Sequence, residues 1–375
     1  MTKASSIGVK RLKVKRIPIY TLIIINIAVV LGLWAIGLCS TLDPNTYGWL
    51  SLSGYALPLF IAANIVFLAL WVFIKKRYIL ISFIGLLCAY VPITLYCPLN
   101  TATAESDLPD SLITVLSYNT SNWGDLTTSP DKVSTAEEKV ASVLEMFKQV
   151  NADIAVLQES PLSNRVDEIL SMYQYADTIM SSNPNGIVLT LLSRYPIIRK
   201  KRIEIETEKN GCGAFWINVN GREVMVINTH LEVMHFSMNE RNQLSTIVHG
   251  NQKDHDSIRT TSHTLIGKIY SSTKKRAVQA DSISAFIKQH AHTPIILAGD
   301  FNDIPNSYVH NTIAESLTDC FATTGFGPGY TFKHFGIRVR IDNIMCSLHF
   351  TPYNCHIVKD IKTSDHQPIT CKVKL

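Results

Sequence analysis

Three long apolar runs near the N-terminus constrain the fold of this 375-residue chain more than any other feature. They comprise residues 17–39, 55–74 and 78–97, and none of them contains a charged residue. Each is close to the roughly 20 residues that a helix needs to cross the hydrocarbon core of a bilayer. Because uncharged runs of this length are rare in soluble domains, we expect three transmembrane helices rather than three helices of a soluble core.

The Lys and Arg residues that flank these runs predict their orientation. Residues 1–16 hold six of them, and residues 75–77 are Lys-Lys-Arg between the second and third runs. The connecting segments 40–54 and 98–110 hold none. Because basic loops stay in the cytosol, we expect a cytosolic tail at 1–16, three spans and an extracytoplasmic chain after residue 97. A cleaved signal peptide is the alternative, but its apolar region is shorter than the first run.

Beyond the spans, the chain changes in composition. Residues 98–111 are polar and predict a linker, and residues 112–375 then predict a soluble domain. Residues 1–100 carry nine Lys or Arg and one acid, a net +8, whereas residues 101–375 carry 26 Lys or Arg and 29 acids, a net −3. The overall charge of +5 therefore belongs to the predicted anchor, and it gives no reason to expect a basic nucleic-acid-binding surface on the domain.

The domain contains alternating signs of strands and helices. Apolar, β-branched runs predict strands at residues 112–118, 153–158, 186–193, 213–219, 222–230, 293–300, 339–347 and 368–373. Asn220-Gly221 between two of them predicts a tight hairpin. Residues 275–290 place Ala277, Ala280 and Ile283 on one face of a predicted helix. Strands joined by both hairpins and helices favour a mixed α/β sandwich over a purely parallel sheet.

Two further features of the domain receive no functional role. Residues 232–273 form a polar insertion with helical patterns at both ends, and we interpret its histidines as solvated: His235, His249, His255 and His263. The five cysteines of the domain form no C-x-x-C pair, which argues against zinc and thioredoxin-type redox sites. We interpret them as small buried apolar side chains, although an extracytoplasmic location would permit disulfides.

Polar residues stand where the apolar runs end. These positions are Asn119, Gln158-Glu159, Asn228-Thr229-His230, Asp300 with Asn302, Asp342 and Ser364-Asp365-His366. A single polar residue at a strand end is usually a cap, but six such ends suggest one shared site. Carboxylates and amides are hard oxygen ligands, so the set suits a magnesium ion and a phosphate.

The order and approximate spacing of these residues resemble the endonuclease/exonuclease/phosphatase superfamily, which has the fold of pancreatic deoxyribonuclease. Gly299-Asp300-Phe301-Asn302 together with Ser364-Asp365-His366 is the most specific pair of motifs. Smaller matches occur at residues 192–196, 276–279 and 329–332. The resemblance covers nearly all of residues 112–375. It implies a four-layer α/β/β/α sandwich, in which two packed mixed sheets are flanked by helices, here preceded by three transmembrane helices.

The resemblance also implies a metal site. Glu159 is then the principal ligand of a Mg²⁺ ion, with Mn²⁺ as a substitute, since Mg²⁺ is often held by only one or two protein carboxylates. Asn119 and Asp365 complete that side of the site.

The same resemblance implies the catalytic groups. Asp300 and Asn302 position and activate the attacking water, and His230 is a candidate general acid for the leaving oxygen. His366 contacts the phosphate or shares its proton, and Asp342 fixes the tautomer of His366.

We therefore expect a membrane-anchored, metal-dependent phosphodiesterase, in the first instance an endonuclease that cleaves nucleic acid outside the cytosol. The alternative is a phosphoesterase acting on lipid headgroups or on inositol or sugar phosphates, for which an anchor beside the bilayer would be useful. A catalytically inactive binding domain is a third alternative. Residues 120–123 and Asn343 depart from the pattern of the nucleases, which leaves the substrate open.

The predicted topology can be tested in membrane vesicles of known orientation. Protease added to right-side-out vesicles should digest the domain after residue 97, because the basic segments predict that it lies on the outer side. The same protease should leave the domain intact in inverted vesicles. The opposite pattern, detected with an antibody against the C-terminus, would contradict the predicted orientation.

Overall fold

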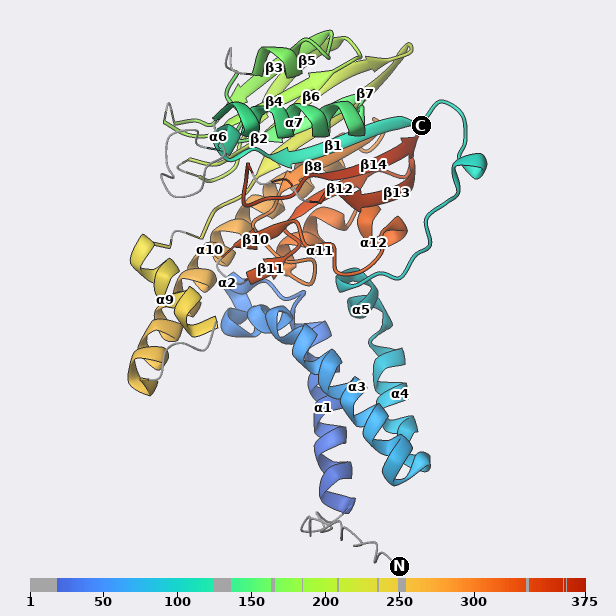
Figure 1. Ribbon diagram of the computed structural model, residues 1–375, viewed down its shortest axis with the longest axis vertical. Helices are drawn as coiled ribbons and strands as arrows, with labels where there is room; N and C mark the ends of the chain where they lie inside the picture. The colour runs from blue at the N-terminus through green and yellow to red at the C-terminus, as the bar shows by residue number, and fades with distance from the viewer. Residues whose placement is uncertain are drawn as a thin grey trace, which may run out of the picture.

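The computed structural model describes residues 19–124, 136–162, 166–183, 185–207, 209–234, 236–248, 254–334, 337–359, 361 and 363–375. A bundle of apolar helices extends from one side of a domain built on two sheets (Figure 1). The predicted cytosolic tail at 1–16 lies outside the described residues, as do His235 and His249 of the insertion.

The N-terminal helices fit a membrane anchor. They are α1 (Ile19–Cys39), α2 (Pro44–Tyr47), η1 (Gly48–Ala56), α3 (Leu57–Ile74), η2 (Lys76–Tyr78), α4 (Ile79–Cys88) and α5 (Tyr90–Tyr96). Two helical segments are long and apolar enough to cross a membrane, Ile19–Cys39 and Pro44–Ile74. The expected third span is bent by 66° between α4 and α5, so the described helices provide two spans, or three if the bent pair counts as one.

A buried polar cluster joins the anchor helices. Trp71 of α3 donates its indole N–H to Asn26 Oδ1 at 2.8 Å, and Asn26 Nδ2 donates to Ser82 Oγ of α4 at 2.9 Å. Interhelical hydrogen bonds of this kind help to fix helix packing where lipid provides no hydrophobic driving force. The three helices therefore form one bundle rather than separate tethers.

The domain has two six-stranded sheets. The first has the order β13-β14-β1-β2-β4-β3, and the second has the order β5-β6-β7-β8-β12-β9. The strands of the first sheet are β1 (Ile113–Asn119), β2 (Ile154–Gln158), β3 (Tyr175–Met180), β4 (Val188–Ser193), β13 (Thr351–Ile357) and β14 (Ile369–Lys374). Those of the second are β5 (Ile197–Ile203), β6 (Gly211–Val219), β7 (Arg222–His230), β8 (Ile295–Asp300), β9 (Thr318–Asp319) and β12 (Asp342–Cys346).

Both sheets are mixed. The pairs β1–β2 and β7–β8 are parallel, and the other ladders within the two sheets are antiparallel. A separate hairpin, β10 (Phe332–His334) with β11 (Ile337–Val339), lies beside the second sheet. The helices of the domain are η3 (Glu105–Asp107), α6 (Ser121–Gly124), α7 (Ala136–Val150), α8 (Asp167–Leu170), α9 (Met238–Val248), α10 (His255–Gln289), α11 (Tyr308–Ala314) and α12 (Cys320–Thr324).

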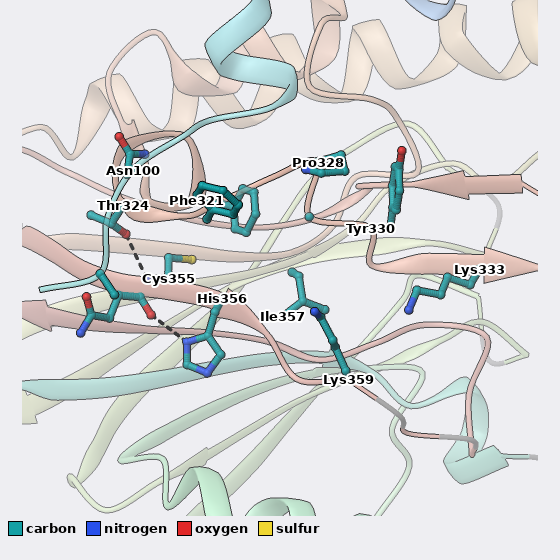
Figure 2. Close-up of a pocket in the computed structure, with 14 residues that line it drawn as sticks. Asn100, Phe321, Thr324, Pro328, Tyr330, Lys333, Cys355, His356, Ile357 and Lys359 are labelled. Atoms are coloured by element: carbon teal, nitrogen blue, oxygen red, sulfur yellow. Dashed lines mark hydrogen bonds between the residues drawn. The ribbon is translucent and has the colours of Figure 1, made fainter. Parts of the chain in front are cut away.

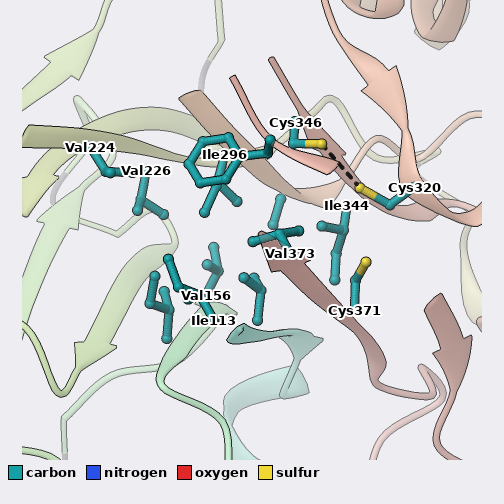
Figure 3. Close-up of a cluster of buried hydrophobic side chains, with 14 of the residues drawn as sticks. Ile113, Val156, Val224, Val226, Ile296, Cys320, Ile344, Cys346, Cys371 and Val373 are labelled. Atoms are coloured by element: carbon teal, nitrogen blue, oxygen red, sulfur yellow. Dashed lines mark hydrogen bonds between the residues drawn. The ribbon is translucent and has the colours of Figure 1, made fainter. Parts of the chain in front are cut away.

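Three apolar clusters define the four predicted layers. Helices α7 and α8 pack on the outer face of the first sheet, and α10 and α11 pack on the outer face of the second. Between the sheets lies a core that includes Val156, Val226, Ile296 and Val373 (Figure 3). The predicted four-layer α/β/β/α sandwich is confirmed.

The cysteines of the domain lie inside it. Cys212, Cys320, Cys346, Cys355 and Cys371 are buried and free. Figure 3 shows Cys320 beside Cys346, with the two sulfurs 3.7 Å apart. These thiols pack as small apolar groups in the core, as burial of free Cys generally favours.

Sequence patterns missed the edges of the sheets and the length of one helix. β3, β5 and β13 are all edge strands, and the β5 sequence IIRKKRI is mostly exposed, so it lacks the apolar run of a central strand. The strand expected at 339–347 is interrupted, because β11 ends at Val339 and β12 begins at Asp342. The helix expected at 275–290 is the C-terminal part of the 35-residue α10, which includes much of the insertion.

The anchor is hydrogen-bonded to the domain. Tyr55 of η1 donates to Asp303 Oδ1 at 3.1 Å, Asn306 Nδ2 donates to Pro92 O at 3.0 Å, and Arg340 Nη2 donates to Leu95 O at 2.9 Å. The expected linker also pairs with the domain, through Leu99 and Phe326. These contacts fix the domain against the membrane helices.

One of these contacts depends on a buried ion pair. Arg340 Nη1 and His310 Nε2 each lie 2.9 Å from Asp319 Oδ2. Burial alone would raise the pKa of Asp319, but the charge of Arg340 and the contact with His310 outweigh it, and the pKa lies well below its ordinary value. The native state therefore binds this proton less readily than the unfolded chain does.

Asp319→Asn should lower the stability of the full chain at pH 7 by ~3–5 kcal/mol, because it leaves Arg340 buried without its partner. The contribution of Asp319 is fully present above the ordinary Asp pKa of about 3.9 and is lost as pH falls through the lower native pKa. The variant should consequently lose less stability than the wild type between pH 5 and pH 3. Chemical unfolding at several pH values measures both effects, and parallel acid profiles would contradict the assignment.

Candidate active site

Strand register brings the polar strand ends together. In the first sheet Asn119 pairs with Gln158, the residue before Glu159. In the second sheet Asp300 pairs with His230 on one side and with Asp342 on the other. Because the two sheets are packed, these ends meet at one edge of the sandwich. They border a cavity of about 400 Å³, lined among others by Asn119, Glu159, His230, Asp300, Asn302, Asp365 and His366.

Asn119 and His230 link the two sheets around Glu159. Asn119 Nδ2 lies 3.2 Å from Glu159 Oε1 and 3.1 Å from Asp300 Oδ2. His230 Nε2 lies 3.0 Å from the same Glu159 oxygen. Burial alone would raise the pKa of Glu159, but the hydrogen bond and charge of His230 outweigh it and lower the pKa to about 2. Glu159 is therefore ionised at neutral pH.

Asn210, which the sequence analysis did not select, orients His230. Its Oδ1 lies 3.0 Å from His230 Nδ1, and its Nδ2 donates to Glu232 Oε2 at 2.9 Å. The second bond fixes which way the amide faces, so His230 Nδ1 is a donor to Asn210. Burial opposes the charged imidazole, but the Glu159 hydrogen bond and the nearby Asp300 raise the pKa of His230 above its ordinary value. Asn210 directly precedes β6 and belongs to no motif, so the sequence offered no sign of this role.

His366 and Asp342 form a second buried pair. His366 Nδ1 lies 2.9 Å from Asp342 Oδ2, and His366 Nε2 lies 3.6 Å from Asp300 Oδ2. Burial would lower the pKa of His366, but the charges of Asp342 and Asp300 outweigh it and raise the pKa to about 10. The imidazole is thus a cation at neutral pH, with Nε2 on the side of the cavity lined by Asp300.

The donor groups fit a divalent cation. Asp300 and Asp342 each offer a carboxylate oxygen within 4.8 Å of the other, whereas the charged His366 beside them donates protons and offers no lone pair. Among the described residues Asp342 Oδ1 is buried without a hydrogen-bond partner, and burial together with Asp342 raises the pKa of Asp300. Crowded carboxylates with an unsatisfied oxygen are the arrangement that a bound cation would relieve.

The expected ligands are placed differently from this cluster. Asn119 and Glu159 are in mutual contact, whereas Asp365 is partly exposed at the rim, with Oδ2 3.5 Å from His334 Nδ1 and Oδ1 4.0 Å from His366 Nε2. Asn302 Nδ2 donates to Leu231 O at 3.0 Å, and its backbone N–H donates to Asp300 Oδ1 at 2.8 Å. Both Glu159 and Asn302 have positive φ angles, 48° and 50°, a backbone conformation that is uncommon for Glu and more usual for Asn.

A second cavity of about 670 Å³ lies where the predicted linker crosses the domain (Figure 2). Lys333 of β10 lines it, whereas the neighbouring Phe332 lines the cavity at the strand ends. Its lining includes Asn100, Tyr330, Lys333 and Lys359. None of its lining residues among those described carries a carboxylate. The described lining of this cavity therefore lacks carboxylates for a hard cation, and we take the cavity at the strand ends as the candidate active site.

Comparison with known families agrees with this geometry. Residues 123–366 match the profile of the Endonuclease/Exonuclease/phosphatase family. The chain belongs to this family. Residues 19–96 match a domain of unknown function, DUF8431, and a search of curated proteins gave no match.

Among solved structures, the catalytic domain of human Nocturnin with bound sulfate is similar at 17% identity, with a TM-score of 0.51 over 70% of this chain and 94% of that one. A humanized TDP2 from D. rerio has 14% identity and a TM-score of 0.49 over 70% and 99%. A mannosyl-6-phosphatase from Bacteroides thetaiotaomicron has 16% identity and a TM-score of 0.47 over 70% and 100%. At this level of identity the Nocturnin likeness shows a shared fold.

Gly299 permits the close approach of β7 and β8 that brings His230 beside Asp300. Its φ is +152°, and a Cβ built on it would lie 1.9 Å from the backbone oxygen of Thr229. Gly299→Ala should therefore destabilise the full chain by ~3 kcal/mol or more, the upper end of the usual range for single substitutions.

Gly267→Ala is the matched control, because a Cβ there meets nothing within 4 Å on the helix α10. This control should stabilise the chain by ~0.5–1 kcal/mol. Chemical unfolding of both variants gives the comparison, and equal effects at the two glycines would contradict the argument.

Proposed function

We propose that the chain is a membrane-anchored, divalent-metal-dependent hydrolase of phosphoesters. Members of its family hydrolyse phosphoesters. The observation that carries the proposal is the convergence of four carboxylates and two imidazoles at one end of two packed sheets: Glu159, Asp300, Asp342, Asp365, His230 and His366. Such a set combines ligands for a hard cation with cationic donors for a phosphate.

Glu159 and Asn119, with Asp365 at the rim, would hold the ion in this proposal. Mg²⁺ is the expected ion, because carboxylate and amide oxygens are the ligands that it prefers. A bound divalent ion would polarise a phosphoryl oxygen and neutralise the charge that develops on it.

The other residues act on water and phosphate. The Asp300 carboxylate, braced by the N–H of Asn302, would orient the attacking water and accept its proton. The charged His366, oriented by Asp342, would donate a hydrogen bond from Nε2 to a phosphate oxygen. Burial raises the pKa of Asp300, and a raised pKa makes a carboxylate a stronger base.

The contacts of His230 favour a role other than the expected general acid. Both of its ring nitrogens are engaged, one by Asn210 and the other by Glu159. We propose that His230 positions Glu159 and keeps it ionised, and that Asn210 supports it. Donation of a proton to a leaving oxygen would first require the contact with Glu159 to break.

The lining of the cavity fits a small phosphoester or a single strand of nucleic acid better than it fits a nucleic-acid duplex. Arg241 is the one Lys or Arg among its described lining residues. Tight duplex binding usually depends on several Lys or Arg contacts to phosphates. The endonuclease hypothesis therefore stays a prediction, and its extracytoplasmic location rests on the pattern of basic residues.

Asp300→Asn in the full chain, in the presence of Mg²⁺, should lower kcat/KM for every phosphoester substrate by roughly 10²–10⁴-fold, the usual contribution of a positioned base. EDTA should abolish the wild-type activity, and added Mg²⁺ should restore it. The exposed Asp107, at the end of η3, provides a matched control in Asp107→Asn, which should keep full activity. A folded Asp300→Asn protein with wild-type kcat/KM would refute the assignment of the site.

A further inference from the structure

The candidate active site is only one end of its cavity. The other end is walled by apolar side chains, and we call this part the apolar groove. It is lined by Val233 and Phe236 after β7, Leu244 of α9, Leu265 and Ile269 of α10, and Ile337 of β11. The groove and the polar site thus line one cavity of about 400 Å³, and Arg241 of α9 is the one Lys or Arg among its described lining residues.

The insertion that follows β7 builds most of this groove. It supplies α9 and the N-terminal half of α10, which pack together and project from the domain on the side of α2 (Figure 1). Lys268 Nζ of α10 lies 2.7 Å from Glu240 Oε2 of α9 and joins the two helices. The insertion therefore places apolar side chains beside the candidate active site. Hydrolysis of a fully polar substrate would not need these apolar side chains.

The groove also touches the anchor. Tyr55, from the η1 turn that leads into α3, lines the same cavity. Nearby, Trp49 of η1 stacks on Tyr270 of α10 with ring centroids 4.3 Å apart. Trp49 and Leu50 of this turn are 53% and 57% exposed. Exposed aromatic residues beside membrane-spanning helices are typical of the interface between lipid and water.

We propose that the apolar groove binds the hydrocarbon tail of a membrane lipid whose phosphoester is hydrolysed at the polar end. The inference rests on the proposed hydrolase function and names its substrate class. The oxygen of water would bond to phosphorus, and the bond between phosphorus and the leaving oxygen would break. One proton of the water would end on that oxygen, and the products would be an alcohol and a phosphate.

Three observations favour a lipid over a nucleotide chain as the occupant. The groove and the polar site line the same cavity, so a ligand with both a phosphate and an apolar part could contact both. Its described lining contains a single cationic side chain, Arg241, whereas a polymer would present several phosphates. Tyr55 lies within Pro44–Ile74, one of the two helical segments long and apolar enough to span a membrane, so a lipid of the surrounding bilayer would lie close to the groove.

The test uses the full chain in lipid nanodiscs with Mg²⁺. The substrates are butyl and octyl 4-nitrophenyl phosphates together with butyl and octyl phosphate monoesters. Burial of one methylene can raise affinity by up to ~4-fold, and an octyl chain has about four methylenes more than a butyl chain. In whichever series the protein hydrolyses, diester or monoester, kcat/KM should therefore be at least ~10-fold higher for the octyl than for the butyl ester.

Two substitutions in the groove should reduce this octyl-to-butyl ratio by ~3-fold or more, Ile269→Gln and Ile337→Gln. Ile266→Gln is the matched control, because Ile266 lies on the same helix, is 46% exposed and does not line the groove. It should keep the wild-type ratio. Thermal melting identifies any groove variant that fails to fold. If Ile269→Gln on α10 does not fold, Ile337→Gln on the β10–β11 hairpin still tests the groove.

The outcomes separate the inference from the function on which it rests. Butyl-ester hydrolysis with an octyl-to-butyl ratio near one would overturn the tail-binding groove and leave the hydrolase proposal intact. A higher kcat/KM for a single-stranded oligonucleotide than for the octyl ester would also overturn it. No hydrolysis of any ester or oligonucleotide by the folded protein would overturn the proposed function itself.

Discussion

The parallel pairing of β7 with β8 is the constraint on which the site depends. The pairing places His230 opposite Asp300, and it is close enough that Gly299 must lack a side chain. Asp300 in turn pairs with Asp342 on β12, so two registers that share β8 align the three candidate positions. A one-residue shift of β8 would turn Asp300 away from the face of the sheet that it shares with His230 and Asp342. The arrangement of the site therefore depends on the alignment of the strands as well as on the identity of the side chains.

Buried charges at the site are held in pairs that cross between elements. Glu159 of the first sheet contacts His230 of the second, and Asp342 contacts His366 from the segment before β14. The hydrogen bond and charge of His230 lower the pKa of Glu159, and the charge of Asp342 raises the pKa of His366. The site therefore keeps opposite charges side by side although it is buried. A phosphate would meet charged donors that are already oriented, and little reorganisation would be needed when it binds.

The strand and helix pattern predicted a mixed α/β sandwich, and the family resemblance predicted its four layers. The polar ends of the apolar central strands do meet at one edge, whereas their catalytic roles stay predictions. It did not predict the edge strand β5, whose exposed Arg and Lys residues hide the strand pattern. The role of Asn210 was also missed, since it arises from a tertiary contact with His230. The apolar groove was missed for a similar reason: Leu265 and Ile269 lie in a segment that is polar overall, and they form a common wall with Leu244 only in the folded chain, where α9 and α10 pack together.

The loop after β8 is shared by the site and the anchor. Asp300 stands at its start, and Asp303, three residues later, contacts the buried Arg276 and the hydroxyl of Tyr55. Membrane helices change their tilt with the thickness of the surrounding bilayer. A change of tilt at the helix turn that carries Tyr55 would pull directly on the loop that carries Asp300. The thickness of the host membrane would consequently affect the geometry of Asp300, the carboxylate that we propose to be catalytic.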